Sequence, residues 1–324
     1  MDALEERLRA VVADVRLEPD VAVTGLHRLT GGASRETWAF DVAGPGGVLE
    51  PLILRRDPPT DARPEGMTVE ALAIRAATRH GVPGPQIVAH SDDPRALESP
   101  YIIMQRIEGE TLARRILRDE EFADIRPRLA TLCGEILARI HSIPVEEVPG
   151  LERRDPVAFL RRRIDGFTDV SPAFELGLRW LDAHRPPPTP ETVVHGDFRN
   201  GNLILGPTAV RAVLDWEMVH AGDPMEDLGW LCVRAWRFGS ELPVGGFGTY
   251  EDLFVAYEAA GGRRVDPAVV HWWEVYGTIE WGVGCLEMAW RHLSGDESSI
   301  ELAAIGRRVW EQEYDLLLLL EAAH

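Results

Sequence analysis

A ten-residue stretch near the middle of the chain, VVHGDFRNGN (193–202), places a histidine, an aspartate, an arginine and two asparagines directly after two valines. A polar cluster of this kind is compatible with an ordinary surface loop, but the residues that follow it point to chemistry. The segment 202–215 contains two β-prone runs, NLIL and AVRAVLD, separated by the turn signal GPT. These runs predict a β-hairpin. The polar cluster therefore lies between a buried strand and a hairpin.

The predicted hairpin brings two oxygen-bearing side chains together. Pairing about the turn places Leu203 opposite Leu214, and so Asn202 roughly opposite Asp215. Facing residues in such a ladder have Cα atoms about 4.5–5.5 Å apart. Asp197 lies just upstream in the same loop. Amide and carboxylate oxygens suit Mg²⁺, which takes one or two carboxylates and completes its octahedron with water and phosphate oxygens. We therefore expect Asn202 and Asp215 to be magnesium ligands.

The motifs HGDFRNGN and VLDWE, followed by GDPMEDLGWLC, resemble the catalytic and metal-binding loops of aminoglycoside phosphotransferase-like small-molecule kinases. These enzymes are relatives of the protein kinases, and the spacing from Asp197 to Asn202 is the D-x-x-x-x-N of a kinase catalytic loop. The resemblance implies that Asp197 accepts or orients the proton of the acceptor hydroxyl. It also implies that Asn202 and Asp215 hold Mg²⁺ and that Asp227 braces the catalytic loop from a helix start.

Three neighbours of these residues have more than one interpretation. His195 lies at the end of a buried strand, where a structural hydrogen bond to the loop is favoured over a ligand or general-base role. Arg199 either steers phosphate or forms a surface ion pair. Glu217 either touches a second metal ion or serves the structure alone, and we favour the structural role.

The resemblance also assigns a phosphate-covering hairpin. The stretch LTGGASRETWAF (29–40) lies between two predicted strands, and a GG-x-S loop is usual at this point in the family. Ser34 and the adjacent backbone amides are therefore expected to contact phosphate, although Gly31 and Gly32 alone would equally serve a plain turn.

The sequence departs from the kinase pattern at the cation that neutralises the phosphates. Protein kinases use a lysine on the third strand, whereas this chain has Arg55 at the matching place. Arginine keeps the charge and binds phosphate through a bidentate fork. Arg56 points to the opposite face of the strand. Glu70 is the expected ion-pair partner of Arg55, and the backbone groups of Gln105 and Ile107 are expected to bind the adenine edge.

The elements around these motifs predict two lobes. Residues 21–104 are mostly strand-like with one helix at 67–81, whereas helical periodicity dominates after Thr111. With the resemblance, this pattern predicts an α+β, bilobal protein-kinase-like fold, in which a small antiparallel sheet precedes a larger and mainly helical lobe. We expect residues 1–105 to form the nucleotide-binding lobe and residues 106–324 to form the catalytic and substrate-binding lobe.

Composition restricts the partners. The chain has 324 residues, 45% of them hydrophobic, and a formal net charge of −19, which disfavours a nucleic acid or an anionic membrane as the main partner. Its three cysteines form no CxxC pair, so we expect reduced thiols, a cytoplasmic location, and neither a disulfide framework nor a zinc site. The charged N-terminus predicts a docking helix with Leu4, Leu8, Val11 and Val15 on one face, rather than a signal peptide.

The expected function is transfer of the γ-phosphate of Mg-ATP to a hydroxyl group of a small molecule. The stretch AVLDWEMVHAGDPMEDLGWLCVRAWRFG is similar to kinase-like domains associated with acyl-CoA dehydrogenases. A hydroxylated metabolite, such as a hydroxyacyl compound, is therefore as plausible an acceptor as an aminoglycoside-like antibiotic. Trp273, Trp281 and Trp290, with Tyr276 and Glu280, lie on one predicted helix, where we expect core packing with a minority lining an acceptor pocket.

Two other functions remain open. A nucleotide-binding pseudokinase with a regulatory role is supported by the missing lysine and opposed by the presence of Asp197, Asn202 and Asp215. A metal-dependent hydrolase built on His195, Asp197 and Asp215 has too few ligands and leaves the first lobe unexplained.

Overall fold

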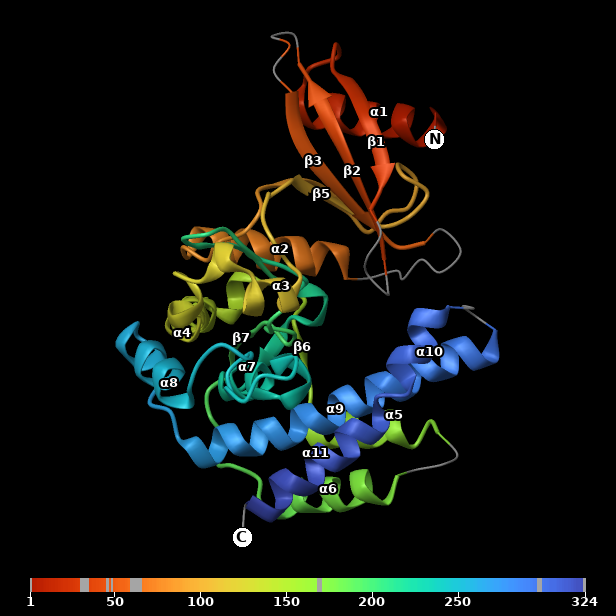
Figure 1. Ribbon diagram of the computed structural model, residues 1–324. Helices are drawn as coiled ribbons and strands as arrows, with labels where there is room; N and C mark the ends of the chain where they lie inside the picture. The colour runs from red at the N-terminus through yellow and green to blue at the C-terminus, as the bar shows by residue number, and fades with distance from the viewer. Residues whose placement is uncertain are drawn as a thin grey trace.

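The computed structural model describes residues 2–29, 35–44, 47, 49–58, 66–167, 171–295 and 299–322. An antiparallel sheet lies at one end of the molecule, and most of the helices lie at the other (Figure 1). This arrangement is the predicted bilobal α+β fold. The boundary between residues 105 and 106 stays a prediction, although the last strand of the sheet ends at Gln105.

The sheet contains the five strands that the sequence predicts, all antiparallel and in the order β1-β2-β3-β5-β4. Their bounds are β1 Ala22–Arg28, β2 Glu36–Ala43, β3 Leu49–Arg56, β4 Ile87–Ser91 and β5 Tyr101–Gln105. Helix α1 (Asp2–Arg16) covers the sheet through Leu8 and Val12, which are fully buried. The predicted face of this helix was wrong at its end, because Val15 in the last turn is 48% exposed.

Helix α2 (Met67–Arg79) connects the two parts of the molecule (Figure 1). One of its faces packs Met67 and Ala71 against Ile102 and Met104 of β5. Its other face, which includes Ile74, belongs to the large core of the helical part. The helix ends at Arg79 and Gly81 follows in the left-handed conformation (φ 80°), as the sequence predicts.

The helical part is organised around one long helix, α9 (Pro267–Ser294), against which α7 (Met225–Cys232) packs. The helical character that the sequence predicts after Thr111 is confirmed. The remaining helices are α3 Ala113–Arg118, α4 Leu129–His141, α5 Pro156–Ile164, α6 Pro172–Ala183, α8 Tyr250–Ala259, α10 Ile300–Gly306 and α11 Val309–Ala322. A short sheet of order β6-β10-β7 is formed by β6 Glu152–Arg153, β10 His220–Gly222 and β7 Thr192–Val194.

The predicted hairpin exists as β8 (Leu203–Leu205) and β9 (Val210–Val213), but its expected register was wrong by one residue. Leu203 pairs with Val213 instead of Leu214, and an irregularity follows between Ile204 and Leu205. The turn is tighter than the expected register implies, because Leu205 already pairs with Val210, and the extra residue at Arg211 then reduces the error to one position at Leu203. The Leu214 amide still donates to the Asn202 carbonyl at 2.8 Å, so the end of the hairpin keeps the two ligand candidates near each other.

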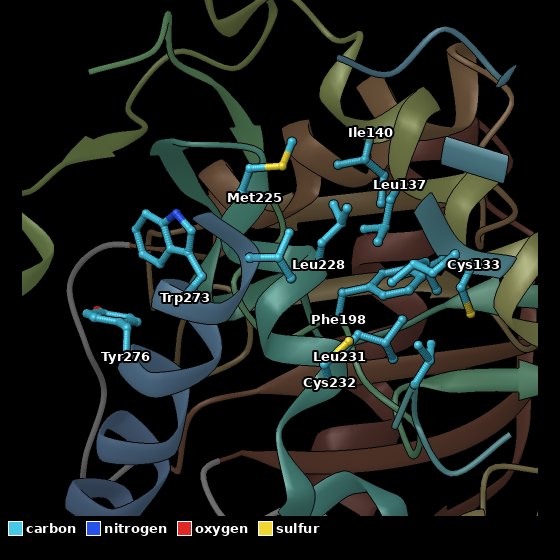
Figure 2. Close-up of a cluster of buried hydrophobic side chains, with 14 of the residues drawn as sticks. Cys133, Leu137, Ile140, Phe198, Met225, Leu228, Leu231, Cys232, Trp273 and Tyr276 are labelled. Atoms are coloured by element: carbon cyan, nitrogen blue, oxygen red, sulfur yellow. The ribbon is translucent and has the colours of Figure 1, made fainter. Parts of the chain in front are cut away.

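A hydrophobic core fixes the segment that carries the polar motif. Phe198, inside the motif itself, is fully buried next to side chains of α4 and α7, including Cys133, Leu228 and Leu231 (Figure 2). Trp273 of α9 belongs to the same core. Most of the aromatic residues of α9 therefore pack in the core, as expected.

All three cysteines (Cys133, Cys232 and Cys285) are buried and none forms a disulfide. Burial raises the pKa of the Cys133 thiol, and it raises the pKa of Cys285 to about 12.

The leucine run of α11 is only partly buried. Leu316 is fully buried, whereas Leu317 is 47% exposed. Within the described ranges, no helix combines the length and apolar character needed to cross a membrane.

The crossing of α7 and α9 gives a test of packing. A Cβ atom at Gly229 would lie 2.5 Å from the Cβ of Trp273, closer than packed atoms allow. We expect Gly229→Ala to lower the free energy of unfolding by about 1–3 kcal/mol, as overpacking does. Gly284→Ala on α9 meets nothing nearer than 3.6 Å and serves as control, since the higher helix propensity of alanine favours it by up to about 1 kcal/mol. Equal urea midpoints for the two variants would contradict this packing.

Candidate active site

The backbone of the polar motif is held by the buried carboxylate of Asp227, in the first turn of α7. Its oxygens accept hydrogen bonds from the amides of His195 (2.8 Å) and Gly196 (2.9 Å). His141 of α4 contacts the same carboxylate at 3.0 Å. Burial opposes ionisation, but these contacts lower the pKa of Asp227 overall. The predicted bracing role of Asp227 is therefore confirmed.

Gly196 is required where the chain turns into the loop. Its φ of +81° lies in the left-handed region, and a Cβ atom there would come within 2.6 Å of the Met218 carbonyl oxygen. Only glycine fits this position without displacing the backbone.

Both ring nitrogens of His195 are used within the loop. Nδ1 accepts the Asp197 amide at 3.1 Å, which leaves the Nε2 hydrogen to be donated to the Leu214 carbonyl at 3.0 Å. Burial lowers the pKa of His195, so the ring is neutral. The arrangement supports the structural interpretation of His195.

Asp197 is buried and accepts three side-chain hydrogen bonds. Oδ1 accepts from Trp230 Nε1 and from Arg199 Nε, each at 2.9 Å, and Oδ2 accepts from Asn202 Nδ2 at 2.6 Å. Burial raises the pKa of Asp197 to about 6, although Arg199 and Trp230 act against the shift. The carboxylate is thus fixed in direction and carries a pKa near neutrality, which is what a general base requires.

Two residues that donate hydrogen bonds to Asp197, Arg199 and Trp230, have contacts that the sequence did not predict. Arg199 is bound to the carboxylate of Asp197, and its guanidinium carbon lies 4.5 Å from the ring centroid of Trp236. It is therefore part of the site and not an isolated surface pair. Sequence reasoning missed Trp230, whose only signal was its place in the GDPMEDLGWLC motif.

Asn202 and Asp215 line the same cleft, and the oxygen of each can face it. The amide nitrogen of Asn202 donates to the carbonyl and the carboxylate of Asp197, which leaves Oδ1 for another partner. Asp215 adopts a left-handed conformation (φ 68°), and its side chain is 30% exposed. No group of three or more His, Cys, Asp or Glu side chains that could hold a metal ion is found in the described ranges. One amide and one carboxylate fit Mg²⁺, which relies on water and phosphate for its other ligands.

Arg55 forms the predicted ion pair with Glu70, with 2.7 Å between Nη1 and Oε1. Its Nη2 donates to Asp215 Oδ1 at 2.8 Å, a contact that the sequence did not predict. Burial opposes the charge, but Glu70 and Asp215 raise the pKa of Arg55 overall, so it remains a cation. Arg56 points away, as expected, and donates to Glu36 at 2.8 Å.

A second arginine was missed. Arg35, only 8% exposed, hydrogen-bonds Glu70 and donates to Asp57 at 3.1 Å. Its Nε also lies 3.7 Å from Glu217, which joins Glu217 to this charge cluster. Burial raises the pKa of Glu217, and the nearby charge of Asp215 raises it further. No periodic pattern singled out Arg35, because it immediately follows the phosphate-loop candidate.

The cleft itself has a volume of about 370 Å³ and lies between the sheet and the β8–β9 hairpin. Four of the expected nucleotide and metal residues besides Asp215 line it: Arg55, Gln105, Ile107 and Asn202. The Gln105 amide already donates to the Gln86 carbonyl at 2.9 Å. No described residue accepts a hydrogen bond from the Ile107 amide, which therefore remains available at the edge of the cleft. Ser34, the expected phosphate contact, lies outside the described residues.

A larger pocket, of about 1200 Å³, opens on the other side of the catalytic loop. Arg199 and Gly201 of the loop line it, together with Trp236 and Trp281. Among the aromatic residues of α9, Trp281 lines this second pocket, whereas Trp290 is 57% exposed.

A bilobal kinase-like fold, with the loop 197–202 next to two pockets, defines the class of this protein. Comparison with known proteins places it in a family. Residues 25–273 match the model of the phosphotransferase enzyme family. Because the match covers most of the chain, the protein belongs to this family of small-molecule phosphotransferases.

Individual relatives are more distant. The chain is 27% identical to acyl-CoA dehydrogenase family member 10 of Mus musculus. The match covers 75% of this chain but only 23% of the length of that relative. The chain is also 27% identical to an aminoglycoside 3'-phosphotransferase of Streptomyces fradiae, over 61% of this chain and 73% of the relative.

Solved structures show the same fold. A ternary complex of the aminoglycoside phosphotransferase APH(4)-Ia with AMP-PNP and hygromycin B superposes with a TM-score of 0.68, at 16% identity, and the match covers 99% of this chain and 98% of that one. At this identity the likeness supports the fold alone.

The Asp227 interaction predicts a large loss of stability on mutation. We expect Asp227→Ala to lower the free energy of unfolding at pH 7 by about 3–5 kcal/mol, because it leaves buried partners without their charge. Asp223→Ala is the control, since among the described residues the Asp223 side chain accepts a hydrogen bond only from the Met225 amide at the start of the same helix, and loss of such a cap costs about 1 kcal/mol.

The sign of the pH dependence follows from the lowered pKa of Asp227. A depressed folded-state pKa stabilises the protein above the unfolded pKa of about 4, and the contribution disappears as the pH falls through the folded value. The difference between wild type and Asp227→Ala in urea denaturation should therefore shrink below about pH 4. A difference that stayed constant to pH 2 would contradict the role of this charge.

Proposed function

We propose that the protein transfers the γ-phosphate of Mg-ATP to a hydroxyl group of a small molecule. The observation that carries this proposal is the position of the catalytic loop, 197–202, between two pockets. Asn202 faces the cleft next to the sheet, whereas Arg199 and Gly201 face the larger pocket. A nucleotide and an acceptor can therefore approach Asp197 from opposite sides.

The smaller cleft fits the nucleotide. Its walls are apolar where a base would lie, with Ile53, Met104 and Trp216 among the lining residues, and its inner end carries Arg55. Arg55 would neutralise phosphate charge, and Asn202 and Asp215 would hold Mg²⁺, which supplies further charge neutralisation between the phosphates. Ile107 offers a backbone donor to the adenine edge.

Asp197 would act on the acceptor. Its carboxylate accepts the proton of the acceptor hydroxyl as the hydroxyl oxygen forms a bond to the γ-phosphorus. The bond from that phosphorus to the bridging oxygen breaks, and ADP leaves with the bonding electrons. Trp230 and Arg199 position the carboxylate for this transfer through their hydrogen bonds.

The alternative of a pseudokinase is less well supported. Its basis was the missing lysine, but Arg55 makes both the Glu70 contact and a contact with the metal-ligand candidate Asp215. A hydrolase with His195 as metal ligand is disfavoured, because both ring nitrogens are used in the loop.

We propose an acceptor from one of two classes, aminoglycoside-like antibiotics or hydroxylated metabolites such as hydroxyacyl compounds. We further propose a cytoplasmic location, which the free cysteines support.

Two substitutions separate binding from chemistry. Asp197→Ala should reduce acceptor-dependent ADP release by at least about a thousandfold, since it removes the base and the positioned oxygen. Its affinity for Mg-ATP, measured by calorimetry, should stay within about threefold of wild type. Asp215→Ala should instead weaken Mg-ATP binding itself. Unchanged turnover in Asp197→Ala would remove Asp197 from the mechanism, and unchanged nucleotide affinity in Asp215→Ala would remove Asp215 from the metal site.

The raised pKa of Asp197 sets a pH dependence. The base must be ionised, so kcat/KM should be constant above about pH 6 and fall about tenfold per unit below it. The Trp230 hydrogen bond lowers the pKa of Asp197, so Trp230→Phe should move the midpoint to higher pH. Profiles of wild type and variant between pH 5 and 9 test this. Superimposable profiles would mean that Trp230 does not act on the base.

A further inference from the structure

The larger pocket is rich in arginine side chains, although the whole protein carries 34 lysine and arginine residues against 53 aspartate and glutamate residues. The lining includes six arginines and four carboxylates: Arg114, Arg115, Arg199, Arg234, Arg237 and Arg308, with Glu241, Glu301, Glu311 and Asp315. Carboxylates outside the lining pair with three of these arginines, so the positive charge that is free to bind a ligand has to be found arginine by arginine.

Two of these arginines have donors to spare. Arg114 is exposed on α3 and forms no ion pair within the described part of the chain. Arg234, whose side chain is 53% exposed, lies 3.5 Å from Asp315 between Nε and Oδ1, longer than a close ion pair. The other four have close carboxylate partners: Arg115 with Asp119 (2.9 Å), Arg199 with Asp197 (2.9 Å), Arg237 with Glu274 (2.7 Å) and Arg308 with Glu311 (3.0 Å).

Two carboxylates that pair with arginines of the pocket have raised pKa values, which favours their uncharged form. Burial raises the pKa of Glu274, the partner of Arg237, to about 7. Burial also raises the pKa of Asp315, the partner of Arg234. The positive charge of Arg237 is thus only partly compensated near neutral pH.

Aromatic rings connect this charge to the catalytic residue. Trp230, which donates to Asp197, lies 5.4 Å from Trp236 between ring centroids, and Trp236 lies 4.8 Å from Trp281. The indole nitrogens of Trp236 and Trp281 have no hydrogen-bond partner among the described residues. Both nitrogens are buried, so these rings give the pocket an apolar wall, whereas the guanidinium groups beside it are donors only and match a ligand that supplies acceptor atoms.

We propose that the acceptor carries an oxyanion, either a carboxylate or a phosphate, in addition to the hydroxyl that is phosphorylated. Arg114 and Arg234 bind this oxyanion while the hydroxyl lies at Asp197. The same pocket repels polycationic aminoglycosides, because they would bring like charge to unpaired guanidinium groups. This inference names the substrate class of the proposed kinase and rests on that function.

The test compares acceptors that differ in charge alone. The probes are hydroxy carboxylates of increasing chain length, the matching hydroxyalkyl phosphates, the corresponding hydroxy amides, and hygromycin B, each assayed by ADP release from Mg-ATP. We expect release with an anionic probe and at least tenfold less with its amide and with hygromycin B. The carboxylate and phosphate series show which oxyanion is preferred. Equal or greater release with amides or hygromycin B would overturn the proposal.

Charge-reversal variants locate the binding group. Arg114→Glu and Arg234→Glu should each raise the KM of the anionic acceptor roughly tenfold or more, with kcat little changed. Arg118→Glu is the matched control, since Arg118 is exposed on the same helix as Arg114 and does not line the pocket. An unchanged KM in both pocket variants would overturn the assignment.

Direct binding separates this proposal from the kinase function itself. Calorimetry of the nucleotide-free protein with the same hydroxy carboxylates and phosphates should show binding that Arg114→Glu weakens and Arg118→Glu does not. No binding of any anionic probe and no ADP release would overturn the oxyanion proposal even if Mg-ATP binds. Absence of Mg-ATP binding would instead contradict the proposed function.

Discussion

The active site depends on one buried carboxylate that is bound to backbone amides. Asp227 satisfies the amides of His195 and Gly196, which otherwise would be buried without partners, and His141 contacts the same carboxylate from α4. Two residues after Gly196, Phe198 is buried in the core next to side chains of α4 and α7 (Figure 2). The loop is therefore held on both sides of Asp197, by a buried carboxylate before it and by packing after it. Loops rarely give such precision unless the surrounding fold fixes them.

A second set of charges connects the sheet to the helical part. Arg55 extends from β3 to Glu70 on α2 and to Asp215 after β9. Arg35, the residue directly before β2, also pairs with Glu70. Buried ion pairs of this kind contribute little net stability, because desolvation offsets the attraction. Their value here is geometric: they align Arg55 of the sheet with Asp215 of the helical part, the two residues that we propose to face phosphate and metal.

The features that depend on neighbouring residues in the sequence, such as helices, strands and turns, could be predicted from the sequence. The strands of the sheet, the α2 helix and the loop 193–202 followed from periodicity, turn residues and motif spacing, whereas the Arg55–Glu70 pair followed from the resemblance to kinases. The register of Leu203 failed because turn signals in a sequence do not show how tightly the turn closes or where a bulge follows it. Arg35 and Trp230 were missed because their roles arise from contacts distant in sequence. The net charge of −19 was uninformative about the acceptor, because it does not reveal that arginines converge on one pocket.

The burial of the three cysteines has a practical consequence for chemical modification. Thiols react as thiolates, and groups whose pKa burial has raised are almost entirely protonated at neutral pH. The native protein should therefore be nearly inert toward maleimides and mild oxidants without any cysteine being replaced. A single cysteine introduced at the rim of either pocket would then be the preferred attachment point for a fluorophore or spin label.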